Sequence, residues 1–427
     1  MPELWWRYAR LPPAGATSTM WQMRGAQPSA DRRSFYLLLV GQLASQVGDA
    51  IFLTTLLLWV ADLTDSSLAV GGLFIARALP IFAVSPFAGV FVDRWRYKPT
   101  LVICDLVRAA LVFALLAVES DDYLPLIYLN VLLLSTSTRF FFPALMSSLP
   151  GMLGEADISR ATSYIRSSFG ISLIVGPLIA APLYVGAGPE LALTVNGASF
   201  LLSAGAIALC RMGLRPVAET PSTGGVWAEM GAGFGLILSS PLQRTVLIAG
   251  GVLLLGAGML DSVNIFFIDE GLDSSRSFVG VAEGLQAAGY TLGALALAGL
   301  ARRFKLWQLV GFGVLAIGFA TLGYSQMTLL VPALALYSFQ GLANGVSDTA
   351  NQTLLVGRTP AGFRGRILSL HDMSAYGSLV VGAALGGVFA EFIGPRWIVT
   401  AAAVLFIAAG LYAIRALSRI PDEPADD

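Results

Sequence analysis

Long apolar stretches alternate with short polar loops along nearly the whole chain. A helix that crosses the roughly 30 Å hydrocarbon layer of a bilayer needs about 20 mostly apolar residues, and twelve stretches reach that length. They lie at about 34–60, 67–92, 99–119, 123–147, 161–185, 190–210, 243–268, 277–300, 306–326, 328–350, 367–391 and 396–416. This pattern predicts an all-α membrane protein with twelve transmembrane helices.

One long polar connection, residues 211–242, divides the twelve stretches into two sets of six. We therefore expect an N-terminal six-helix bundle over 34–210 and a C-terminal six-helix bundle over 243–416. Residues 1–33 are expected to form an N-terminal arm, and 417–427 a short tail. The arm lacks the uninterrupted apolar core of a signal peptide, so cleavage is not expected.

Basic residues gather in alternate loops. With the segments above, 20 of the 26 Lys and Arg residues lie on the side of the two termini. The opposite loops carry only Arg276 and Arg396 among many acidic residues. Because Lys and Arg beside transmembrane segments favour the cytoplasmic side, both termini, the arm, the tail and the central loop are expected there. The predicted location is the cell inner or plasma membrane.

The composition agrees with a multi-pass membrane protein. Of the 427 residues, 56% are hydrophobic and 12% charged, and the mean hydropathy is +0.73, whereas soluble chains have about 25% charged residues. The net charge of −1 gives no indication of nucleic-acid binding. Cys104 and Cys210 are expected to be inert packing residues. Because His371 is the single histidine, a histidine-based metal site is not expected, and no cofactor is predicted.

Shifting the chain by 210 residues superposes several glycines and prolines. The matched pairs are Gly48 and Gly258, Gly89 and Gly299, Pro150 and Pro360, and Gly176 and Gly386. The basic cluster after the second segment recurs after the eighth, as GLARRFK at 299–305. The repeat predicts two pseudo-symmetric bundles, an arrangement that transporters use to alternate access to a site near the bilayer midplane.

The stretch GVFVDRWRYKP at 89–99 follows the second apolar segment on the predicted cytoplasmic side. It resembles the signature loop of the major facilitator superfamily, approximately G-x-x-x-D-R-x-G-R-[RK]. The matching residues are Gly89, Asp93, Arg94 and Lys98, whereas Arg96 and Tyr97 depart from the pattern. The resemblance implies that Asp93 and the cations form a cytoplasmic gate that latches the two halves in the outward-facing state. Alternatively, the cations are only topology markers.

Two further motifs resemble exporters of this superfamily. In the first helix, Gly41-Gln42 with Ser45, Gly48 and Asp49 resembles the branch that holds macrolide-efflux proteins and enterobactin exporters. In the fifth helix, Gly176-Pro177 is similar to the exporter pattern G-x-x-x-G-P-x-x-G-G, with small residues in place of three glycines. The second resemblance implies export rather than import.

Ionisable groups within a membrane are costly and suggest function. Asp49 in the first helix and Arg139 in the fourth are expected to form a midplane pair in the substrate cavity, with Asp49 coupling transport to protons. A structural pair that only neutralises both charges is the alternative. Asp261, in the seventh helix, is a further cavity residue or a gate residue nearer the outer side.

Other membrane charges are expected to pair with close neighbours. Asp105 and Arg108 are three residues apart and can meet on one helix face. Arg77 and Glu283, in the second and eighth helices, are expected to find partners in the outer half.

The chain has no G-x-x-x-x-G-K-[ST] motif, so ATP is not the expected energy source. We expect a monomeric secondary transporter that exports small amphiphilic molecules of drug, macrolide or siderophore type by proton antiport. Its expected partners are the small-molecule substrate, protons and the lipid bilayer, and no catalytic residue is predicted. The alternatives are an importer or lysophospholipid flippase of the same fold and, from another class, a membrane enzyme or pore.

Overall fold

The structure is a computed structural model. It describes residues 32–92, 94–118, 123–153, 155–211, 240–359 and 364–420. The regular elements of these ranges are all helices. This confirms the predicted all-α class, and the predicted N-terminal arm, most of the central loop and most of the tail lie outside the described residues.

Apart from three very short elements, the helices follow the predicted apolar segments. They are α2 (Arg32–Thr64), α3 (Ser67–Ala83), α4 (Ser85–Val92), α5 (Tyr97–Ala114), α6 (Leu124–Ser148), α8 (Glu155–Leu209), α10 (Pro241–Phe266), α11 (Phe278–Leu300), α12 (Leu306–Gln326), α13 (Leu330–Gly357), α14 (Arg364–Ile393) and α15 (Pro395–Leu417). The short elements are η2 (Leu115–Ala117), α7 (Pro150–Leu153) and η4 (Phe267–Gly271).

Local sequence explains where several helices start or break. The hydroxyls of Ser66 and Ser240 accept hydrogen bonds from backbone N–H groups in the first turns of α3 and α10. Inside α8, Gly188 has φ 72° and ψ −178°, a conformation that favours glycine. Pro189 follows it and suits the first position of a new helical stretch. The boundary between the predicted segments 161–185 and 190–210 therefore coincides with this break.

Eight helices in the described ranges are long and apolar enough to cross a membrane, judged by length and composition. One of the eight is the 53-residue stretch of α8 that includes the break at Gly188. The predicted segment 67–92 is shared between α3 and α4. Helices α11 and α13 fall outside the eight, because polar residues such as Glu283 and Asp348 interrupt their apolar sequences.

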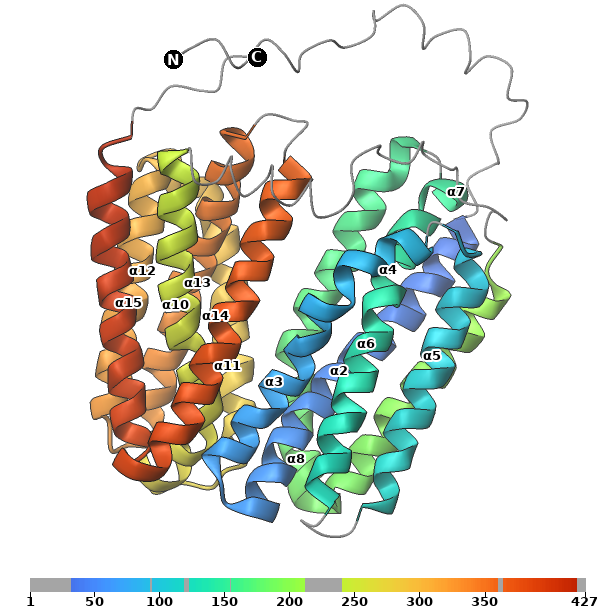
Figure 1. Cartoon of the computed structure of the whole chain (residues 1–427), viewed down its shortest axis with the longest axis horizontal. Helices are drawn as coiled ribbons and strands as arrows, with labels where there is room; N and C mark the ends of the chain where they lie inside the picture. The colour runs from blue at the N-terminus through green and yellow to red at the C-terminus, as the bar shows by residue number, and fades with distance from the viewer. Residues whose placement is uncertain are drawn as a thin grey trace, which may run out of the picture.

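The helices gather in two groups (Figure 1). Helices α2 to α8 lie on one side and α10 to α15 on the other, and the helices of the first group are inclined to the nearly upright α10, α12 and α15. We call the end at which α2 begins and α15 ends the proximal end, and the end at which α2 and α14 end the distal end. The two groups pack through α3 against α14 and α10, and through α8 against α11.

The buried apolar core is continuous between the groups only towards the distal end. There one cluster combines residues of both groups, including Leu56, Val70, Leu260 and Val279. Towards the proximal end each group has a core of its own. The first includes Leu38, Leu101 and Leu145, and the second includes Leu242, Val310 and Ala413. The two groups are therefore joined at the distal end.

Two glycines of the 210-residue repeat occupy equivalent contacts. Gly176 on α8 lies against Ala50 and Ile51 of α2, and Gly386 on α14 lies against Met259 of α10. Ala50 shifted by 210 residues is position 260, next to Met259. Glycine lets helix backbones approach closely in a membrane, so the repeated glycines position the same helix pair in each group.

Candidate functional site

Asp49 lies about half-way along α2 and is half-buried. The side-chain amide of Asn196, on α8, lies beside its carboxylate, and Asn196 is fully buried. Nevertheless, Oδ1 of Asp49 and Nδ2 of Asn196 are both buried and have no hydrogen-bond partner among the described residues. Such groups are costly to leave unpaired. Asp49 therefore provides an acceptor that a proton or a ligand could satisfy.

The predicted partner of Asp49, Arg139, does not pair with it: no ion pair joins Asp49 to Arg139 within the described residues. Arg108, on α5, and Arg77, on α3, belong to the electrostatic surroundings of Asp49. Helix α6, which carries Arg139, packs against α3, α4 and α5, whereas α2 packs chiefly against α8.

Asp105 and Arg108 form the buried ion pair that their spacing predicts. Their side chains are 0% and 3% exposed, and the guanidinium donates to the carboxylate one turn away. The Arg108 guanidinium also lies over the rings of Phe141 and Phe200, at 4.1 and 4.6 Å from their centroids. The cation is thus held by a carboxylate and two aromatic faces, and the Asp105 carboxylate balances its charge.

Arg139 faces a different environment. Tyr376 on α14 and Arg77 on α3 belong to its electrostatic surroundings. The Nε atom of Arg139 is buried and has no hydrogen-bond partner among the described residues. Helix α3 packs against both α6 and α14, so it lies between the helix of Arg139 and the second group.

Glu283, on α11, contacts the first helix group directly. Its Oε2 accepts a hydrogen bond from the hydroxyl of Thr54, on α2, at 3.0 Å. Arg77 is exposed on α3, and no ion pair joins it to Asp49, Asp261 or Glu283 within the described residues. Arg77 and Glu283 were predicted to find partners in the outer half of the membrane, and their place on helices that contact the other group was not predicted. The common feature, a charge on a helix that contacts the other half, cannot be read from one sequence.

A second cluster of charges joins the groups at the distal end. Arg276, in the loop before α11, bonds to Asp269 at 2.7 Å in its own group. It also bonds to Asp65 at 2.5 Å and Asp62 at 3.3 Å in the other group, and donates to the Ala61 carbonyl at 3.0 Å. Partial burial opposes its charge, but the hydrogen bonds and charges of Asp65 and Asp269 prevail and raise the pKa of the Arg276 guanidinium. We call these residues the distal latch.

Gly176 and Pro177, the motif predicted in the fifth helix, lie at a contact between the groups. While Gly176 packs on α2, the Pro177 carbonyl lies against Gly280 of α11. A side chain at position 280 would collide with that carbonyl. The motif therefore lies where α8 must slide or separate from α11 if the two groups move.

The signature residues lie at the proximal end. Gly89 is in α4, and the exposed Arg94 follows that helix. Nζ of Lys98 donates to the Cys210 carbonyl at 2.9 Å, which ties the start of α5 to the end of α8. Asp93 lies outside the described residues. The latch role of this loop stays a prediction.

Metal binding finds no support in the described ranges, where no group of three or more His, Cys, Asp or Glu side chains could hold an ion. The site is instead a set of carboxylates and arginines between two helix groups.

A family model described as "Transmembrane secretion effector" matches residues 28–427, and its family belongs to the major facilitator superfamily. The chain is a member of this superfamily. It is 26% identical over 395 residues to "Uncharacterized MFS-type transporter YfiS" of Bacillus subtilis (strain 168), covering 89% of this chain and 92% of that protein.

Two shorter matches carry exporter names. "Putative bacilysin exporter BacE" of Bacillus subtilis is 31% identical over 184 residues, which is 42% of this chain and 45% of that one. "Macrolide efflux protein A" of Streptococcus pyogenes is 30% identical over 152 residues, or 35% of this chain and 38% of that one. These relatives confirm the resemblance to the macrolide-efflux branch of the superfamily.

Solved superfamily structures share the fold. A bacterial homologue of the lysosomal transporter Spinster, inward-facing and unoccupied, has a TM-score of 0.73 at 13% identity, covering 92% of this chain and 98% of that one. The nucleoside transporter NupG also has a TM-score of 0.73 at 13% identity, covering 91% and 100%. The family match and the relative that covers most of the chain show that it is a multi-pass membrane transporter and not an enzyme.

Proposed function

We propose that this superfamily member is a secondary active exporter of small amphiphilic molecules of drug, macrolide or siderophore type, driven by proton antiport. The exporter and efflux names of two relatives support the direction and the substrate class. The absence of a nucleotide-binding motif from the sequence favours an ion gradient as the energy source.

We further propose twelve membrane crossings in two six-helix bundles, at 34–210 and 243–416, acting as a monomer. Two observations support this count. The break at Gly188 allows α8 to cross twice, and the 210-residue repeat pairs α2 with α8 as it pairs α10 with α14. The basic loops on the side of the termini favour a cytoplasmic proximal end. Since the bundles join at the distal end, the conformation would then be inward-facing.

The observation that carries the proposal is the hydrogen bond between the bundles from Thr54 of the first to Glu283 of the second, at 3.0 Å. Asp49 lies on the same helix as Thr54. When the bundles rock apart this bond must break, and a carboxylate that loses a hydrogen-bond donor takes up a proton more readily. Proton binding is in this way linked to the motion that exposes the cavity. Asp49, with a buried oxygen that lacks a partner, is our candidate for the coupling residue.

The test is uphill transport into inverted membrane vesicles or proteoliposomes under an imposed pH gradient, with a macrolide as the first probe. We expect gradient-driven accumulation by the wild type and its loss in Asp49→Asn, while substrate exchange without a gradient persists. Asp273→Asn, which changes an exposed acid in a distal loop, is the matched control. Full gradient-driven transport by Asp49→Asn at normal protein level would refute this assignment. Accumulation in the opposite direction would instead indicate an importer.

A further inference from the structure

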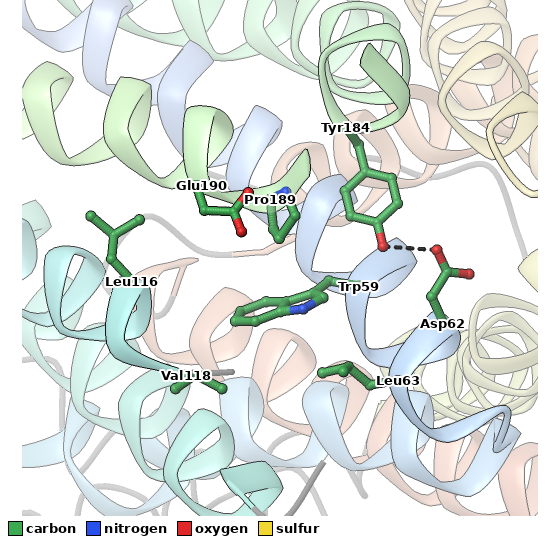
Figure 2. A pocket seen from close by; sticks show the side chains of 8 residues that line it. All are labelled: Trp59, Asp62, Leu63, Leu116, Val118, Tyr184, Pro189 and Glu190. Carbon is green, nitrogen blue, oxygen red and sulfur yellow. Dashed lines mark hydrogen bonds between the residues drawn. The ribbon is translucent and has the colours of Figure 1, made fainter. Parts of the chain in front are cut away.

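A pocket of about 480 Å³ opens at the distal end of the first helix group. Trp59, Asp62 and Leu63 of α2 form one part of its lining, and Tyr184, Pro189 and Glu190 around the break in α8 form another. Leu116 and Val118, at the end of the third predicted segment, complete it. Figure 2 shows the Trp59 indole in the middle of this lining, with Asp62 and Tyr184 to one side and Glu190 to the other.

The Glu190 carboxylate lies directly against Gly188, at the break. A Cβ atom at position 188 would meet Oε2, the end of this flexible and exposed side chain. Gly188 also has a positive φ. Glycine at this position therefore allows both the break and the placement of the acid. Within the described residues, the exposed Glu190 carboxylate has no hydrogen bond or ion pair.

Trp59 provides a second observation that suggests a ligand. Its side chain is only 8% exposed, yet it lines the pocket and its indole N–H makes no hydrogen bond among the described residues. An indole face is the aromatic surface that best attracts an organic cation. Pro189 and the three aliphatic residues add apolar surface that would suit alkyl groups on such a cation.

The pocket adjoins the distal latch through Asp62. Oδ2 of Asp62 accepts a hydrogen bond from the Tyr184 hydroxyl at 2.7 Å, while Oδ1 binds Arg276 at 3.3 Å. The Tyr184 to Asp62 bond is drawn in Figure 2. Asp62 thus faces the pocket on one side and a guanidinium on the other. A second cation in the pocket would compete with Arg276 for the charge of this carboxylate.

We infer that this pocket binds a small organic ammonium ion, with its charge near Glu190 and Asp62 and its alkyl groups against Trp59. The volume lies within the range of small-molecule sites, about 300–1,000 Å³. The ion is either a free ammonium compound or the ammonium headgroup of a lipid. The pocket is separate from Asp49, Asp261 and Glu283. Binding of an ammonium ion in it is expected for either direction of transport.

Equilibrium binding of radiolabelled choline to the purified full-length protein in detergent tests the inference. We expect Glu190→Gln to weaken choline binding about three- to fivefold, as for loss of a partly exposed ion pair. The exposed control Asp273→Asn should leave binding unchanged. The uncharged carbon analogue 3,3-dimethyl-1-butanol should compete poorly. Equal binding by wild type and Glu190→Gln, or equal competition by the neutral analogue, would overturn the inference.

Two further measurements identify the source of the ion and the link to the latch. In nanodiscs of phosphatidylglycerol, added phosphatidylethanolamine should weaken choline binding if a lipid headgroup is the natural occupant, and should leave it unchanged if a free ion is. Arg276→Gln should tighten choline binding about threefold, because it releases one cation from Asp62. Unchanged choline binding by Arg276→Gln would show that the bound ion and Arg276 do not compete for Asp62.

Discussion

Removal of the Arg276 guanidinium should open the distal end of the molecule. Arg276→Gln keeps a polar side chain of similar length but removes the charge that joins the two helix groups. Three of its contacts cross between the groups, namely those to Asp62, Asp65 and the Ala61 carbonyl. The Asp269 pair lies within one group, so it contributes equally whether the groups are joined or parted.

The size of the effect follows from the exposure of the partners. The Arg276 side chain is 21% exposed, but Asp62 and Asp65 are 46% and 77% exposed, so each ion pair contributes near the low end of about 0.2–1 kcal/mol. The charged hydrogen bond to the carbonyl adds about 1.5 kcal/mol. Together the contacts stabilise the joined state by about 2 kcal/mol, which corresponds to a shift of about thirtyfold in population.

Distances between spin labels at Leu126 and Leu329 would measure this shift. Both side chains are exposed and lie at the distal end in different groups, and neither is part of the latch. Cys104 and Cys210 are buried and would be replaced by alanine. We expect a longer-distance population in Arg276→Gln that is absent or minor in the parent protein.

Two controls separate the latch from a general loss of structure. Asp269→Asn should shift the distances much less, because it removes a partner from the same group. Asp65→Asn combined with Arg276→Gln should give no larger shift than Arg276→Gln alone, since both changes remove one interaction. Identical distance distributions for Arg276→Gln and the parent protein would refute the latch.

Three further predictions concern the moving contacts and the orientation. Gly280→Ala should also favour the state in which the distal end is open, because the added Cβ would collide with the Pro177 carbonyl. Gly299→Ala should have no effect, because there is open space around position 299. Equal distances between the spin labels in the two variants would contradict this. Asp93→Asn should reduce transport and shift the pattern of cysteine accessibility towards that of the inward-facing state, while expression and substrate binding stay normal. An unchanged accessibility pattern would show that Asp93 is an ordinary loop charge. Tags at either terminus should be protected from protease added to intact cells, so cleavage of a C-terminal tag from outside would reverse the predicted orientation.

The apolar pattern was sufficient to predict the helices, because a membrane helix is specified mainly by length and hydropathy. Where the prediction differs from the structure, the difference lies at a helix boundary. Val84 separates α3 from α4 inside one predicted segment, whereas the predicted boundary near Gly188 coincides with the break inside α8. The repeat was equally informative, because a glycine at a helix crossing is required by the backbone geometry itself, and Gly176 and Gly386 both lie at such crossings.

Charge partners were harder to predict than helices, because a sequence gives the depth of a residue but not the face it occupies. Asp105 and Arg108 were paired correctly since their three-residue spacing fixes a shared face. Asp49 and Arg139 both lie near the middle of their helices, but no ion pair joins them within the described residues.

Arg276 was the one charge whose importance the loops could have indicated. It is one of two cations among the acids of the loops opposite the termini, and a cation surrounded by carboxylates is held rather than left in solvent. It bonds to one carboxylate of its own helix group and two of the other. By the charge rule, cations are disfavoured in these loops. A cation that is nevertheless present there has a structural or functional reason. In this chain the reason is the contact that joins the two groups.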